Sequence, residues 1–308
     1  MTGNHYPMTI TEKISRLKKE KNAVVLAHNY QLPEIQDIAD FVGDSLGLSL
    51  QAAKTDASVI VFCGVHFMAE TAKILSPQKT VLLPEKNAGC LMADMIDAEG
   101  LKALQSAHPD AVTVCYVNSS AAVKALCDYC CTSANALKMT RKILAQNRDI
   151  IFVPDQNLGR YVSGQLNHDF ILWEGCCPIH ADITPEDIQQ TRKLHPQAKV
   201  IVHPECKPAI TALADIVSST EGMTRYVKNS PDKEFIIGTE IGIIHRLQKE
   251  NPEKSFYPAS DQAVCADMKK INLEKVLWSL ENMSYEITLS TEIADRARLS
   301  IDRMLQTL

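Results

Sequence analysis

The strongest constraint on the fold is an internal repeat with a period of about 88 residues. Three strand-like runs each end in a polar residue, and these residues lie 88 and 87 positions apart: His28, Tyr116 and His203. A hydroxyl residue follows 17 positions after each: Ser45, Ser133 and Thr220. A cysteine follows each polar residue by 62, 61 and 62 positions: Cys90, Cys177 and Cys265. Three features that keep their phase to within one residue predict three similar units.

Each unit alternates strand-like runs with helical stretches. In the first unit the strands are expected at 24–30, 58–63 and 80–83, with a helical stretch at 46–53. Such alternation is typical of βαβ units with a parallel sheet. We therefore predict an α/β protein of three similar parallel-sheet αβα domains in a pseudo-threefold arrangement. The expected boundaries are 20–106, 107–193 and 194–280, with helical segments at 1–19 and 281–308 packing across the repeats.

Polar residues follow the first strand of every unit, where ligands of open parallel sheets bind. They are His28, Tyr30, Tyr116, Asn118, His203 and Glu205. Threefold packing would bring these strand ends together on one axis. His28 and His203 could move protons near neutral pH, and Glu205 is the candidate carboxylate for general acid–base catalysis.

The three hydroxyl residues each precede an apolar helical run, so we expect Ser45, Ser133 and Thr220 to be helix N-caps. The N-terminus of a helix presents unpaired backbone N–H groups, which bind phosphate or carboxylate. The pattern therefore favours small anionic substrates.

Ten cysteines are many for a chain whose first residues contain no secretory signal pattern. In a reducing compartment, metal binding or redox chemistry is a better explanation than disulfides. Three thiolates from Cys90, Cys177 and Cys265 could hold zinc with a fourth ligand. They could equally hold a [4Fe–4S] cluster whose fourth iron has no protein ligand. Such an iron is a Lewis acid, which suits dehydration.

The other cysteines are expected to have structural roles for the most part. Cys63, Cys115 and Cys206 lie in or beside apolar strand-like segments, where cysteine behaves as a small buried hydrophobic residue. Cys127 and Cys130 form a CxxC motif, which is a weak redox signal on its own.

Charge and hydropathy exclude several classes of partner. The net charge is −5 and the isoelectric point is near 6.0, so no basic surface for nucleic acid or anionic lipid is expected. The longest apolar run, around 59–63, is far shorter than the roughly 20 residues that cross a bilayer. We expect a cytoplasmic protein with no nucleic-acid or membrane partner.

Several motifs resemble the quinolinate synthase A protein family of de novo NAD biosynthesis, over about residues 12–306. The matching segments are 27–30 (AHNY), 43–46 (GDSL), 87–95 (NAGCLMADM), 116–120 (YVNSS), 131–136 (CTSANA), 173–180 (WEGCCPIH), 203–206 (HPEC), 218–223 (SSTEGM), 238–240 (GTE) and 265–270 (CADMKK). The resemblance implies a transferase that condenses iminosuccinate with dihydroxyacetone phosphate to give quinolinate, phosphate and water. A transient partner, L-aspartate oxidase or dehydrogenase, could supply the imine.

The resemblance also implies a role for each matching residue. The ligands of one [4Fe–4S] cluster with an open iron would be Cys90, Cys177 and Cys265. The substrate-binding residues would be His28, Ser45, Tyr116, Val117 (through its backbone), Asn118, Ser133, His203, Pro204, Glu205 and Thr220. The residues moving protons would be Glu205, Tyr30, His28 and His203, and His180 would lie near Tyr30.

One position departs from the family pattern, because Cys176 precedes the expected ligand Cys177. The repeat phase favours Cys177, and Cys176 is the alternative ligand. Three other functions also stay open: another [4Fe–4S] hydro-lyase, a non-catalytic iron–sulfur redox protein, and a zinc protein.

Overall fold

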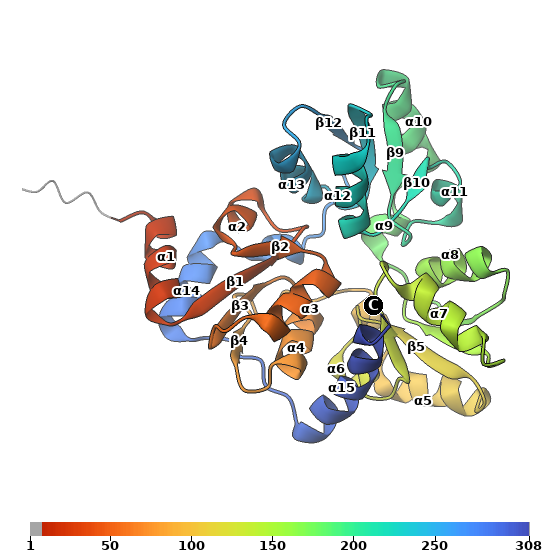
Figure 1. The fold of residues 1–308 in the computed structure, drawn as a ribbon, viewed down its shortest axis with the longest axis horizontal. Helices are drawn as coiled ribbons and strands as arrows, with labels where there is room; N and C mark the ends of the chain where they lie inside the picture. The colour runs from red at the N-terminus through yellow and green to blue at the C-terminus, as the bar shows by residue number, and fades with distance from the viewer. Residues whose placement is uncertain (1–7, 308) are drawn as a thin grey trace, which may run out of the picture.

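The computed structural model describes residues 8–307, in which three four-stranded sheets form three lobes around a common centre (Figure 1). Every strand pair within these sheets is parallel, and each sheet has the same order, with the first strand of its unit in the second place. The predicted α/β fold of three similar parallel-sheet domains is confirmed. In spatial order the strands are β2 (Phe41–Gly43), β1 (Ala23–His28), β3 (Val59–Cys63) and β4 (Thr80–Leu82); β6 (Tyr129–Cys131), β5 (Val112–Tyr116), β7 (Ile150–Val153) and β8 (Ile171–Leu172); and β10 (Ile216–Val217), β9 (Lys199–Val202), β11 (Glu234–Gly238) and β12 (Ser255–Pro258).

Helices connect the strands and cover the sheets. They are α1 (Ile10–Glu20), α2 (Pro33–Ile38), α3 (Ser45–Lys54), α4 (His66–Leu75), α5 (Ala98–Ala107), α6 (Ala121–Lys124), α7 (Ala136–Leu144), α8 (Gln156–Leu166), α9 (Pro178–Ala181), α10 (Pro185–Leu194), α11 (Pro208–Thr211), α12 (Thr220–Asn229), α13 (Ile243–Glu250), α14 (Leu273–Asn282) and α15 (Thr291–Leu305), with 3₁₀ turns η1 (Ala93–Met95) and η2 (Met268–Lys270). None of the helices in residues 8–307 combines the length and apolar character that a bilayer crossing requires.

The repeat extends to single hydrogen bonds. Just before each edge strand, an aspartate carboxylate accepts the N–H of a residue in the central strand. The donor–acceptor pairs are Val25–Asp40 at 2.7 Å, Thr113–Asp128 at 2.8 Å and Val200–Asp215 at 2.8 Å. Each bond extends the ladder by one step beyond the backbone pairing, so the three units share their local construction as well as their topology.

The helix that follows each candidate cysteine ligand packs on the next unit. Leu101 of α5 belongs to the core of the second sheet, and α10 lies against β11 of the third. Helix α14 closes the ring by packing against α1 and β3 of the first sheet, as the blue helix beside the red lobe in Figure 1 shows. One helix of each unit therefore packs against the next unit. This packing holds the ends of the first strands of the three units in fixed positions relative to one another.

The expected domain boundaries remain a prediction. Each sheet lies within one of the ranges 20–106, 107–193 and 194–280, but the packing of α5, α10 and α14 favours boundaries placed before those helices. Of the terminal segments, α15 packs against α4 and β6 and so touches two lobes. Residues 1–7 and 308 of the predicted terminal segments lie outside the described part of the chain.

The predicted N-cap roles are wrong in detail. Asp44 and Ser219 cap α3 and α12 by accepting the N–H of Gly47 and Gly222, whereas Ser45 and Thr220 are the first helical residues. Ser133 lies in the turn before α7, whose N-cap is Asn135. Because a neighbouring residue occupies each cap position, the three hydroxyls are free to face the centre of the molecule.

Candidate functional site

A cavity of about 160 Å³ lies where the strand ends of the three units meet. Its lining includes most of the predicted site residues: His28, Tyr30, Ser45, Cys90, Tyr116, Asn118, Ser133, Cys177, His203, Glu205, Thr220 and Cys265. Val117 and Pro204 are not among the lining residues; the N–H of Val117 is bonded to Cys131 O at 2.9 Å. Residues up to 237 positions apart in the sequence thus share one enclosed space.

The three candidate cysteine ligands are placed by one repeated backbone bond. Two residues before each cysteine, a carbonyl oxygen accepts the N–H of the third residue after a strand end. The pairs are His66–Ala88 at 2.8 Å, Gln156–Gly175 at 2.8 Å and Ile241–Ala263 at 3.0 Å. At Gly175 a Cβ atom would lie 2.5 Å from Pro154 O, so this approach requires glycine. The equivalent residues in the other two units are small alanines.

Burial keeps these thiols protonated in the absence of a metal. It raises the pKa of Cys90 to about 12, and the charge of Cys265 contributes to that shift. It also raises the pKa of Cys177, with contributions from Glu205 and Cys90. Each sulfur is faced by N–H groups of the turn that follows it, including those of Ala93, His180 and Met268, which partly offset the rise in pKa. Donors in this position stabilise a thiolate and a metal-bound sulfur alike.

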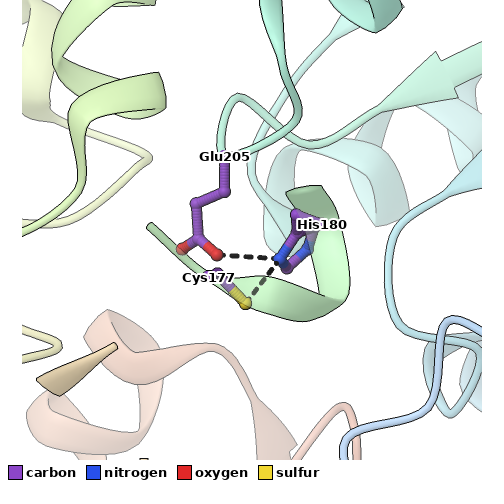
Figure 2. A group of neighbouring side chains, drawn as sticks. All are labelled: Cys177, His180 and Glu205. Carbon is purple, nitrogen blue, oxygen red and sulfur yellow. Dashed lines mark hydrogen bonds and ion pairs between the residues drawn. The ribbon is translucent and has the colours of Figure 1, made fainter. Parts of the chain in front are cut away.

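Glu205 belongs to a buried hydrogen-bonded group, and Figure 2 shows its contact with His180, which also contacts Cys177. Its Oε1 accepts the Tyr116 hydroxyl at 2.5 Å, and its Oε2 lies 2.8 Å from His180 Nδ1. Burial raises the pKa of Glu205, but His180, His203 and the Tyr116 hydroxyl outweigh it, so the pKa lies below its usual value. Burial and the charge of Glu205 raise the pKa of Tyr116. The pair is therefore a carboxylate beside a protonated phenol at neutral pH.

A second chain of polar groups leads away from His180. Its Nε2 lies 2.7 Å from the hydroxyl of Thr239, which lies 2.5 Å from that of Tyr30. Because the Glu205 carboxylate only accepts, His180 Nδ1 donates to it, and in the neutral form of the imidazole Nε2 is then the acceptor. The hydroxyl of Thr239 then donates to Nε2, and the hydroxyl of Tyr30 donates to Thr239. The chain connects Tyr30 to Glu205 with one consistent direction of donation.

The two equivalent histidines share one tautomer. Nδ1 of His28 accepts the N–H of Tyr30 at 3.2 Å, and Nδ1 of His203 accepts the N–H of Glu205 at 3.3 Å. Burial lowers the pKa of both histidines to about 3, so both are neutral at pH 7. Their protons are therefore on Nε2, which in His203 lies 3.2 Å from the hydroxyl of Ser133.

Among the remaining cysteines, Cys63, Cys115 and Cys206 are buried as predicted. Cys176 does not line the cavity, and its N–H lies 3.4 Å from Met95 Sδ. The buried residues that the repeat did not reveal are Thr239, Asp155 and Glu240. His180, which only the resemblance placed near the site, is central to it: its Nδ1, Cys177 Sγ and a Glu205 oxygen lie within 4.8 Å of one another (Figure 2).

Known proteins are similar to this chain over nearly its whole length. The family model described as quinolinate synthetase A protein matches residues 12–306. The chain belongs to this family. A quinolinate synthase of Dehalococcoides mccartyi is 56% identical over 98% of this chain and 100% of its own length. Quinolinate synthases of Methanosarcina barkeri and Geobacter metallireducens are 55% and 52% identical, each over 96% of this chain and 97% of their own.

Family membership confirms the resemblance and identifies the chain as an enzyme of the quinolinate synthase type, acting in NAD biosynthesis on small-molecule substrates. The alternatives of another hydro-lyase or a non-catalytic redox protein are not favoured. The cavity lined by cysteine, histidine and glutamate is consistent with an iron–sulfur cofactor.

Proposed function

We propose that this chain condenses iminosuccinate with dihydroxyacetone phosphate to form quinolinate, in a cavity that also holds a [4Fe–4S] cluster. The observation that carries the proposal is the meeting of Cys90, Cys177 and Cys265, one from each repeat, in a cavity rich in hydrogen-bonding groups. The overall reaction balances without an oxidant: four carbons and the nitrogen come from the imine, three carbons come from the triose, and phosphate and two waters leave.

The cysteines suit a cluster better than a single ion. They come from equivalent positions of three repeats, as three equivalent ligands of one cluster would, whereas the turn N–H groups that face each sulfur would support zinc and iron alike. When bound, a [4Fe–4S] cluster with three cysteine ligands offers one iron as a Lewis acid for a substrate hydroxyl.

A mononuclear zinc site on Cys177, His180 and Glu205 is the competing arrangement, since their ligand atoms lie within 4.8 Å. It would leave Cys90 and Cys265 without a function and would remove the carboxylate that faces Tyr116. Purified without oxygen, a zinc protein would be colourless, whereas the [4Fe–4S] protein would be brown.

We assign the moving of protons to the hydrogen-bonded chain. Glu205 is a carboxylate within the cavity and can accept a proton from a substrate carbon or nitrogen. Once Glu205 has given this proton to a departing hydroxyl group, the chain from Tyr30 through Thr239 and His180 can supply the next one along bonds of 2.5–2.8 Å, and Tyr30 then takes a proton from the cavity that it lines.

Substrate binding falls to the neutral donors. Ser45 and Thr220 lie at the first positions of α3 and α12, where the partial positive charge of the helix favours carboxylate or phosphate. His28 and His203 each carry a proton on Nε2, and Asn118 lines the same cavity. Uncharged hydrogen-bond donors bind an anion less tightly than a buried positive charge would. The anionic product can therefore leave the site.

The proposal is tested with anaerobically purified protein. We expect close to four irons and four sulfides per chain, a brown colour, and quinolinate formed only when both iminosuccinate and dihydroxyacetone phosphate are supplied. Zinc in place of iron, or loss of phosphate without ring formation, would contradict it.

A further inference from the structure

The three cysteine loops share the repeated backbone bond, but the residue type at one equivalent position differs. The second residue after the strand end is Val65 in the first unit, Asp155 in the second and Glu240 in the third. Asp155 Oδ2 accepts the N–H of Cys177 at 3.1 Å, and Glu240 Oε1 accepts the N–H of Cys265 at 3.1 Å. Two of the three candidate ligands are thus held by a buried carboxylate, while the equivalent side chain before Cys90 is apolar.

Each carboxylate also binds the start of the helix that follows its strand, and Asp155 is the N-cap of α8. Asp155 uses its second oxygen for the N–H of Leu158 at 2.7 Å, and Glu240 uses its second for the N–H of Gly242 at 2.8 Å. Both oxygens of each side chain are therefore occupied by backbone donors. The carboxylate is a bridge between the start of the helix that follows the strand and the cysteine loop.

Burying these two carboxylates costs free energy, because it removes them from water. Asp155 and Glu240 have no exposed surface, and an ionised carboxylate is stable in such a place only when donors surround it. Lys269 supports Glu240 at 2.8 Å and also donates to the carbonyl oxygen of Tyr30 at 2.5 Å. In this way the bridge of the third unit is tied to the strand end that carries Tyr30.

We propose that Asp155 and Glu240 are positioning residues that hold the Cys177 and Cys265 loops in the geometry that binds the iron–sulfur cluster. This inference rests on the cluster of the proposed function. A carboxylate is required because a side-chain amide has one acceptor oxygen for two N–H groups. Residues that orient a metal ligand typically contribute about 10- to 100-fold to metal affinity.

The test compares Asp155→Asn with Asp128→Asn in protein loaded with iron and sulfide under anaerobic conditions. Asp128 makes the same kind of bond, to the N–H of Thr113 at 2.8 Å, but Thr113 is a residue of strand β5 and not a candidate ligand. We expect iron to pass to a chelator about tenfold faster or more from Asp155→Asn, and at the parental rate from Asp128→Asn. The reduction potential of the cluster is expected to shift only in Asp155→Asn.

Glu240→Gln provides a second, independent variant, with the same expectation for iron release. Thermal unfolding of the metal-free proteins separates positioning from folding. Both variants should still unfold cooperatively, with a melting temperature lowered by no more than the loss of one buried hydrogen bond explains. Parental rates of iron release in both variants, or a failure of both to fold without metal, would overturn the inference and leave the proposed function intact. A parent protein that takes up no iron and sulfide would overturn both.

Discussion

Two groups of cysteines in this chain occupy opposite kinds of environment. Cys90, Cys177 and Cys265 come from three repeats, and backbone N–H groups face their sulfur atoms. Cys115, Cys127 and Cys130 come from one repeat and lie in the core of its sheet, with Cys115 and Cys130 paired across adjacent strands.

The difference lies in which hydrogen-bond partners surround the sulfur. In the core group, Cys127 donates to Val123 O at 3.1 Å and Cys115 lies 3.3 Å from Tyr116 O. Carbonyl oxygens accept from a thiol and repel a thiolate, whereas N–H groups favour the thiolate. Burial alone does not distinguish a ligand from a structural cysteine; the polarity of its neighbours does.

The largest effect is expected from replacing the three cysteines that line the cavity. Cys90→Ala, Cys177→Ala and Cys265→Ala should each abolish cluster assembly and quinolinate formation, because the three sulfurs share one cofactor. Iron and sulfide analysis with an assay for quinolinate measures both effects. Cys63→Ala, in the core of the first sheet, should retain both and serves as the control. A full cluster in Cys177→Ala would make Cys176 the ligand.

Glu205→Gln separates binding of the cofactor from chemistry in the same cavity. The substitution keeps the shape of the side chain but removes its charge, so iron and sulfide should remain at parental levels. We expect kcat/KM to fall by about 10²- to 10⁴-fold, the range for loss of a general base. Full activity with normal iron content would exclude Glu205 from proton transfer.

Thr239→Val interrupts the chain between Tyr30 and His180 without changing the volume much. Thr239 is fully buried, so no water can replace its hydroxyl from the surface. We expect a fall in kcat of about 10- to 100-fold, the effect of losing a buried hydrogen bond, with the cluster intact. Thr239→Ser should recover most of the rate; if Thr239→Val retains the parental rate, protons take another route.

The sequence predicted those parts of the site that keep the repeat phase. His28, Tyr116 and His203 end or follow equivalent strands, and the cysteines lie at equivalent positions after them. From each of these polar residues, Val65, Asp155 and Glu240 lie 37, 39 and 37 positions further on. The second unit therefore has two extra residues before this position, and the first unit has an apolar residue there. For these two reasons, comparing the repeats at a constant spacing does not identify Asp155 and Glu240.

Other features needed three-dimensional information. Thr239 is equivalent to Gly64 and Pro154 in the other two units, so no repeat marks it. Its function comes from contact with Tyr30 and His180, which belong to different repeats. The capping by Asp44 and Ser219 depends on a choice between adjacent polar residues, which helix propensity does not settle.

The smallest effect is expected in the core group and concerns the CxxC motif. Burial raises the pKa of Cys127 and of Cys130, so neither forms the thiolate that redox exchange requires at neutral pH. In the native, cluster-loaded protein at pH 8, iodoacetamide should leave both unmodified over a time that fully labels the denatured chain, as peptide mass spectrometry can measure. Rapid labelling of Cys127 and Cys130 in the native protein would instead mean that this motif opens to solvent. The cavity cysteines and the core cysteines would then differ in cofactor binding, but reagents from solvent would reach both sets. The polarity of the atoms around the sulfur would then not be enough to distinguish a ligand from a structural cysteine.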